Sequence, residues 1–379
     1  MNLSELSERF NTHDKCVEHL EKIRWGFKPK PECPYCGSDS IYVRGRKRKF
    51  SKQRTAHIYK TPRYSCNKCH RDFTVLTETI FEASKMPLQK WFQVIALMLN
   101  NPNGVSAMNI HINVGITYRT AWYCGMRIRC AMLDQPDMLE GVVEMDESYF
   151  GGRKRHRPAY AQAYLGYKGV KVDEWGKVSY KRGRGTDKVK VVGVVSRGKN
   201  GKIGKVALKV ENDRLTGETM LKILKKYVNI DRKKTKVMTD EFRGYNVFDK
   251  HLLHYTVNHM SKEYVRHLKG IKGGIHTGTI DAVWNIIKSG IKGQYRVLSR
   301  KYLPFYLAEA AYKYNRRDKK RTNAPFNETI ANAVLEEKCE VNYKPKKHPA
   351  LLAYGRKEKK ETKRKRHERV SVPVKRKRK

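Results

Sequence analysis

Three aspartates lie in segments whose patterns could bring their carboxylates together. Asp146 and Asp240 each end an apolar, β-like run, VVEMD and KVMTD. Asp281, Trp284 and Lys288 stand at i, i+3 and i+7 of a helical stretch, so their side chains point from one face. Converging carboxylates repel each other unless divalent cations neutralise them. We therefore predict that the three acids bind two Mg²⁺ or Mn²⁺ ions about 3.5–4 Å apart, as in two-metal sites that act on phosphodiester bonds.

Taken singly, each aspartate has a simpler interpretation, because an Asp that ends a strand is commonly a turn or cap residue. The three meet only if the strands pair in the RNase H-like manner. In that arrangement the first acid lies on the first strand, the second ends the fourth strand, and the third comes from a helix packed on the sheet.

Two C-x2-C pairs, Cys33/Cys36 and Cys66/Cys69, supply four thiolates, enough to close one tetrahedral zinc site. Four cysteines leave no open position for water, which predicts a structural zinc ion in a zinc ribbon. The segment between the pairs, residues 37–65, is strongly basic and favours contact with DNA over contact with protein. The other cysteines are interpreted as plain thiols.

The charge of the chain points to a polyanionic partner. The chain has 82 Lys and Arg residues against 37 Asp and Glu residues, which gives a formal net charge of +45. Residues 355–379 hold 14 of the basic residues and 3 Glu, which leaves +34 on the rest. Double-stranded DNA is the polyanion that suits the metal site. A basic surface that serves solubility alone is the other interpretation.

Neither a membrane nor a secretory segment is expected. No apolar run approaches the ~20 residues that span a bilayer. The N-terminus MNLSELSERF also lacks the apolar centre of a signal peptide.

The segment SAMNIHINVGITYRTAWYCGMRIR is typical of a helix-turn-helix. Its turn falls at 113–115, and Thr117 would cap the second helix. On that helix Tyr118, Arg119 and Arg127 could meet bases or phosphates. Paired helices are also common without any role in DNA binding, so this interpretation stays open.

These patterns predict a multi-domain α/β protein. Its parts are an N-terminal zinc ribbon, a helix-turn-helix segment and an RNase H-like catalytic domain with a mixed sheet flanked by helices. The expected boundaries are a helical lead-in at 1–30, the ribbon at 31–76, the helix-turn-helix segment at 77–139, the catalytic domain at 140–320 and a basic, largely disordered tail at 321–379.

The chain resembles the zinc-ribbon DDE transposases of bacterial insertion sequences, the ISXO2-like group, and the related Merlin elements. The resemblance covers roughly residues 30–317. It rests on several segments in the same order: the C-x2-C pairs, TYRTAWYCGMRIR, VEMDESYFGGRKR, VMTDEFRGY, VNHMSKEYV, IHTGTIDAVWNIIKSGIKGQYRVLSRKYL and EAAYKYNRR.

The resemblance implies a transposase that binds the terminal inverted repeats of its element and catalyses metal-dependent DNA cleavage and strand transfer. It makes Asp146, Asp240 and Asp281 the catalytic acids and Lys288 a residue that holds DNA near them. Trp284 also matches the pattern and is expected near the DNA. Lys292, four residues after Lys288, either holds DNA as well or is merely solvated. Because two element ends must meet, we expect a homodimer or a larger assembly.

One position departs from the family pattern: Asp281 stands where the family usually has Glu. The shorter side chain lacks one methylene, about 1.5 Å of reach, but keeps its charge. We expect an active enzyme. Two alternatives are an RNase H-like nuclease or resolvase, and a catalytically inactive transposase-derived DNA-binding regulator, which the shorter acid favours.

The C-terminal PVKRKRK allows two interpretations of where the protein acts. In a eukaryotic host it would be a nuclear localisation signal. In a bacterium it would be a non-specific DNA-binding tail on a cytoplasmic, nucleoid-associated protein.

Overall fold

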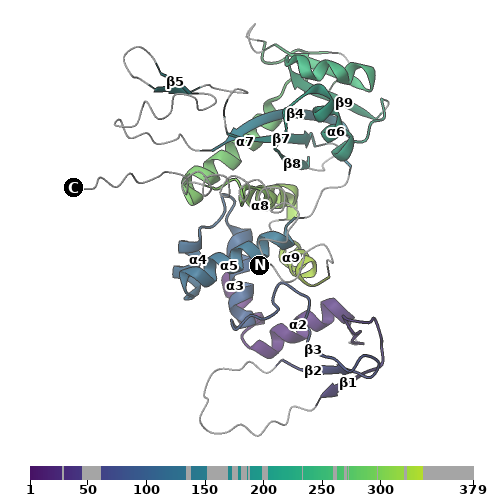
Figure 1. Cartoon of the computed structure of the whole chain (residues 1–379), viewed down its shortest axis with the longest axis vertical. Coiled ribbons are helices and arrows are strands. Elements are labelled where there is room, and N and C mark those ends of the chain that lie inside the picture. The colour runs from purple at the N-terminus through teal and green to yellow at the C-terminus, as the bar shows by residue number, and fades with distance from the viewer. Residues whose placement is uncertain are drawn as a thin grey trace, which may run out of the picture.

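The computed structural model arranges a small ribbon, a body of helices and an α/β body along the longest axis of the molecule (Figure 1). It describes residues 1–27, 30–44, 61–133, 138–151, 170–172, 178–180, 186, 188–198, 204–232, 234–258, 263–268, 271, 273–296, 298–319 and 322–335. The segments 37–65 and 153–187 are therefore described only in part, and the tail after 335 lies outside the described residues.

The ribbon is a three-stranded antiparallel sheet. Its strands are β1 (Ile41–Arg44), β2 (Arg63–Cys66) and β3 (Asp72–Phe73), in that order. Tyr64 and Phe73 stack with ring centroids 5.6 Å apart, and the Trp25 ring meets Tyr64 edge-on at 5.0 Å. Since Trp25 ends helix α2, aromatic packing attaches the ribbon to the helical body.

The helical body combines both ends of the described chain. It contains α1 (Leu3–Arg9), α2 (His13–Trp25), α3 (Leu88–Asn100), α4 (Ala107–Val114), α5 (Tyr118–Ala131) and α9 (Ala324–Leu335). Leu6 of α1, Trp91 of α3 and Ile330 of α9 are buried in one hydrophobic core. The boundaries expected at 30 and 320 therefore fall between helices that pack together in one core. These contacts join segments that are distant in the sequence, so no local sequence pattern indicates them.

Helices α4 and α5 lie where the helix-turn-helix was predicted. Gly115 ends α4 in the left-handed conformation, with φ of 64°. The Thr117 side chain then accepts a hydrogen bond from the Thr120 N–H and caps α5. The two helices pack against each other. The structure thus has two packed helices separated by a turn at these residues, and their role as a DNA-binding helix-turn-helix stays a prediction.

The α/β body is built on a five-stranded mixed sheet in the order β10-β9-β4-β7-β8. The strands are β4 (Gly141–Phe150), β7 (Val189–Ser196), β8 (Val206–Glu211), β9 (Thr235–Asp240) and β10 (Leu253–Val257). β4, β7 and β8 pair antiparallel, whereas β9 and β10 run parallel to β4. A separate hairpin of β5 (Val170–Val172) and β6 (Val178–Tyr180) lies between β4 and β7 in the sequence.

Helices cover both faces of this sheet (Figure 1). On one face α6 (Gly217–Tyr227) and the 3₁₀ helix η3 (Arg243–Lys250) pack on strand residues such as Val192 and Val194. On the other, α7 (Gly278–Gly290) and α8 (Leu303–Asn315) pack on Val191 and Val195. The alternation along β7 is what a strand buried on both faces requires.

Helix α8 joins the sheet to the helical body, since it contacts both β8 and α5. At its end the Asn315 side chain accepts from the Val206 N–H at 2.7 Å and donates to the Val206 carbonyl at 3.0 Å. Arg316 then pairs with Glu328 of α9. The YNRR segment that contributed to the resemblance therefore holds the fold together.

A buried ion cluster ties α8 to α5. Glu309 accepts hydrogen bonds from Arg129 and Lys313, each at 2.7 Å, and all three side chains are almost fully buried. Tyr295 also donates to Glu309 at 3.2 Å. Because Tyr295 ends η4 (Ile291–Tyr295), a π-helical continuation of α7, the cluster reaches the far end of that helix. No described helix has both the length and the apolar character needed to cross a membrane.

The packing of α7 on the sheet depends on a glycine. Gly193 of β7 pairs with Asp146 of β4, and the Trp284 ring of α7 lies over it. A Cβ atom at Gly193 would come within 2.7 Å of Trp284 Cζ2 and 2.9 Å of Ile280 Cδ1. Any side chain here must push the helix away from the sheet.

We predict that Gly193→Ala lowers the free energy of unfolding by about 1–3 kcal/mol, because overpacking displaces α7. Denaturant unfolding of the full chain measures this. Gly293→Ala is the matched control, since a Cβ there meets nothing within 4 Å. It should change stability by no more than about 0.5 kcal/mol. Equal stability of the two variants would contradict the tight packing of Trp284 on Gly193.

Candidate active site

Asp146 and Asp240 lie side by side on neighbouring parallel strands. The ladder between β4 and β9 ends where Glu144 pairs with Met238. Asp146 and Asp240 each follow two residues later on their strands, and they lie close enough for the charge of Asp240 to help raise the pKa of Asp146. Asp146 is on the first strand of the sheet and Asp240 ends the fourth, as predicted.

The Asp146 carboxylate is held by α7. Oδ2 of Asp146 accepts a hydrogen bond of 2.9 Å from the Trp284 indole N–H. Burial, and then the charges of Glu147 and Asp240, raise the pKa of Asp146 to about 7, although the Trp284 hydrogen bond opposes this. A bound cation would offset both causes, so the surroundings of Asp146 fit a metal ligand.

Asp240 is partly accessible at the end of β9. Its Oδ1 accepts from the Phe242 N–H at 3.1 Å, which turns the chain into η3. Tyr245 of η3 is buried nearby and donates to Glu147 at 2.8 Å. Burial, followed by the charges of Glu147, Asp146 and Asp240, raises the pKa of Tyr245, so the tyrosine is a hydrogen-bond donor beside the acids.

Asp281 lies in the first turn of α7, on the helix that packs on β4 and β7. Its side chain is exposed, as are Lys288 and Lys292 further along α7 and η4. In the described part of the chain, the four ribbon cysteines are the one group of three or more metal-ligating side chains close enough to share an ion. The structure thus places Asp146 and Asp240 near each other. The Asp281 carboxylate is not close enough to share a metal ion with them.

Glu144 is a buried residue of this site that the sequence analysis did not single out. It lies two residues before Asp146 and faces the start of α7, where it accepts hydrogen bonds from Thr279 and Ile280. Arg197 pairs with it at 2.6 Å. The sequence does contain a signal for this role: Glu144 is a charged residue two positions before Asp146, and residues at this spacing lie on the same face of a strand.

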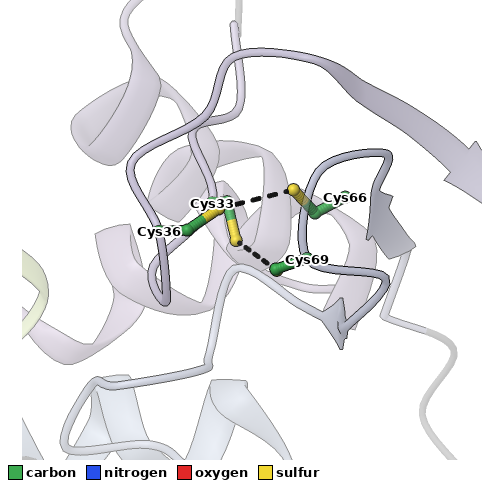
Figure 2. Close-up of side chains that lie close together, drawn as sticks. All are labelled: Cys33, Cys36, Cys66 and Cys69. Atoms are coloured by element: carbon green, nitrogen blue, oxygen red, sulfur yellow. Dashed lines mark hydrogen bonds between the residues drawn. The ribbon is translucent and has the colours of Figure 1, made fainter.

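The four ribbon cysteines do converge (Figure 2). Their ligand atoms lie within 4.8 Å of one another, with Cys33–Cys69 and Cys36–Cys66 sulfur distances of 3.5 and 3.6 Å. Zn–S bonds of about 2.3 Å place tetrahedral sulfurs roughly 3.8 Å apart, so the group could hold one zinc ion. Backbone N–H groups of Cys69 and Lys68 help to lower the pKa of Cys66 to about 6.

The predicted DNA contacts differ in accessibility. Tyr118 and Arg119 are exposed at the start of α5. Arg127 is 5% exposed, and its guanidinium donates to the carbonyls of Ile80 and Glu82 at 2.7 and 2.8 Å. Trp284 is buried and bonded to Asp146. Arg127 and Trp284 therefore have partners within the protein in this structure, and a DNA contact of either side chain stays a prediction.

Comparison with known proteins agrees with these observations. Residues 138–315 match the family described as the ISXO2-like transposase domain. A relative in the transposable element ISH50 of Halobacterium salinarum is 26% identical over 282 residues, which cover 72% of this chain and 81% of that protein. The matched domain begins just before β4 and ends with α8, so it contains Asp146, Asp240 and Asp281.

We predict one zinc ion per chain, bound by the ribbon thiols. Cys66→Ala should lose the zinc, as measured by atomic absorption, and lower the melting temperature, because metal binding contributes to folding. Cys124→Ala is the matched control, since burial raises the pKa of this thiol to about 12 and it lies in the helical core. It should retain the metal. Zinc retained by Cys66→Ala would contradict the four-cysteine site.

Proposed function

We propose that the protein is a DNA transposase, because residues 138–315 match the ISXO2-like transposase domain. It would bind the terminal inverted repeats of its insertion sequence and carry out metal-dependent cleavage and strand transfer. The observation that carries the proposal is the proximity of Asp146 and Asp240 to each other beside a helix that bears a third acid.

The topology supports an RNase H-like catalytic domain. Three antiparallel strands are followed by two strands parallel to the first, in the order β10-β9-β4-β7-β8. The acids occupy the first strand, the end of the fourth and a helix packed on the sheet, which is the arrangement that RNase H-like pairing requires. This common arrangement supports the fold, whereas the chemistry must be argued from the side chains.

Asp146, Asp240 and Asp281 would hold two Mg²⁺ or Mn²⁺ ions. Such ions supply activation of an attacking water or 3′-OH and stabilise the leaving oxygen. The contribution of the chain is orientation: the Trp284 indole fixes Asp146, and the Phe242 N–H fixes Asp240. Asp281 would contribute its carboxylate from the first turn of α7.

The DNA is proposed to contact exposed basic and aromatic groups. Lys288 and Lys292 extend along α7 and η4 beyond Asp281, where they could bind the phosphate backbone. Tyr118 and Arg119 at the start of α5 would contact the terminal repeat. The ribbon, with one structural zinc ion, adds a basic module, and the net charge of +45 supplies non-specific affinity.

Joining two element ends to a target requires two active sites, so we propose a homodimer or larger assembly on DNA. The protein would act where its DNA is, at the nucleoid of a bacterium or in the nucleus of a eukaryote. A nuclease or resolvase with the same fold would cleave DNA without joining it to a target.

The exposed Asp281 favours one alternative, a DNA-binding regulator that no longer cuts. With one methylene fewer than the usual Glu, Asp281 lies outside the pair formed by Asp146 and Asp240. Such a protein would bind the element ends without needing Mg²⁺.

We predict that Asp146→Ala, Asp240→Ala and Asp281→Ala each reduce cleavage of DNA carrying the element ends by about a hundredfold or more, because each removes a proposed metal ligand. Binding to the same DNA, measured by electrophoretic mobility shift, should remain. Asp213→Asn changes an exposed acid outside the site and should cut normally. A native chain that binds the ends but never cuts would favour the regulator.

Asp281→Glu tests the length of the third acid. The added methylene extends the carboxylate by about 1.5 Å toward the other two. We predict that this variant cuts at least as fast as the native chain and needs no more Mn²⁺, as measured by cleavage rate against Mn²⁺ concentration. A large loss of cleavage would contradict this prediction and would mean that the site is adapted to the shorter Asp.

A further inference from the structure

The N-cap residue of helix α7 does not cap the helix with its own side chain. This residue, Thr277, makes no side-chain hydrogen bond to the helix, although the first N–H groups of any helix need outside acceptors. Glu144 provides them from β4. Its Oε2 accepts from the N–H groups of Thr279 and Ile280 at 2.8 and 2.9 Å, and its Oε1 accepts from the Thr279 hydroxyl at 2.7 Å. A strand residue therefore caps this helix.

The remaining N–H groups of the first turn are also satisfied. His276 Nδ1 accepts from the Gly278 N–H at 3.1 Å, which places the ring proton on Nε2. Burial, and then the charge of Arg197, lower the pKa of His276, which favours this neutral ring. The Asp281 N–H donates to the Thr277 carbonyl at 3.2 Å. With all four groups paired, α7 has one defined starting point.

Arg197 completes the arrangement. Its Nε donates to Glu144 Oε1 at 2.6 Å, while its other nitrogens donate to the carbonyls of Gly274 and His276 at 2.7 and 2.8 Å. The Glu144 side chain is fully buried and Arg197 is 13% exposed. A buried carboxylate is tolerated only with such partners. The same guanidinium thus neutralises Glu144 and anchors the loop that leads into α7.

Strand β4 therefore holds α7 at two points on one face. Glu144 fixes the start of the helix, and Asp146, two residues later, binds Trp284. Asp281 lies between these anchors, in the first turn. We infer that Glu144 and Arg197 are positioning residues that determine where Asp281 stands relative to Asp146 and Asp240. The inference rests on the proposed metal site.

The test is Glu144→Gln in the full, zinc-loaded chain. The glutamine NH₂ must face either the N–H groups of α7 or the Arg197 guanidinium, so donors oppose donors in both orientations. We expect the Mn²⁺ concentration that gives half of the maximal thermal stabilisation to rise about tenfold, the scale seen when groups supporting metal ligands are removed. This readout measures metal binding and does not depend on catalysis.

Glu309→Gln is the matched control, because Glu309 is also buried and paired with an arginine, Arg129, but belongs to the helical body. It should lower the melting temperature and leave the Mn²⁺ midpoint unchanged. The inference is overturned if Glu144→Gln keeps the native midpoint, or if both variants shift it equally.

A third variant covers the case in which Glu144→Gln does not fold. Arg197→Lys keeps a positive charge beside Glu144 but cannot reach both loop carbonyls, and should raise the Mn²⁺ midpoint in the same direction. A native midpoint in Arg197→Lys would then overturn the inference.

Asp146→Asn separates this inference from the proposed function. If native chain and Asp146→Asn respond identically to Mn²⁺, the metal site itself fails, and the inference with it. If the native response depends on Asp146 while the Glu144 and Arg197 variants behave as native, only the positioning role fails.

Discussion

The attachment of α7 to β4 is the contact on which the candidate site depends. Glu144 and Asp146 lie on one face of β4. Glu144 accepts hydrogen bonds from the first turn of α7, and Asp146 accepts one from the Trp284 indole of the same helix. Gly193 on the neighbouring strand leaves the space that the indole fills. Because the helix also carries Asp281 and Lys288, the same contacts that stabilise the fold determine where these two side chains stand.

Electrostatics explains why acids are gathered in so basic a chain. Asp146 loses water by burial and lies near other carboxylates, and its pKa rises to about 7. Such a group favours a nearby cation. The excess of lysine and arginine in the chain would attract the backbone of the proposed DNA partner. Divalent ions would neutralise the acids and would also coordinate the phosphate oxygens of the DNA.

Local patterns in the sequence are enough to predict the elements that carry the site. Alternating apolar residues predict β4 and β9 with their acids, the helical spacing predicts α7, and Gly115 with Thr117 predicts the break between α4 and α5. The paired C-x2-C segments likewise predict the convergence of the four cysteines. In each case the signal lies within a few residues of the feature.

Contacts between distant segments could not be predicted in this way. Glu144 caps a helix that begins more than a hundred residues later, so its role has no local signature. Arg127 has the sequence context of a DNA contact, yet it binds the carbonyls of Ile80 and Glu82. Likewise, no pattern in the sequence predicts that α1 and α9 pack in one hydrophobic core.

The central claim is that three carboxylates close around divalent cations when DNA is bound. Anomalous scattering from Mn²⁺ in crystals of the chain with an element end would test it most directly. The account predicts two peaks beside Asp146 and Asp240, with Asp281 brought in as the third ligand. No manganese between Asp146 and Asp240, or bound metal with Asp281 left outside, would contradict it.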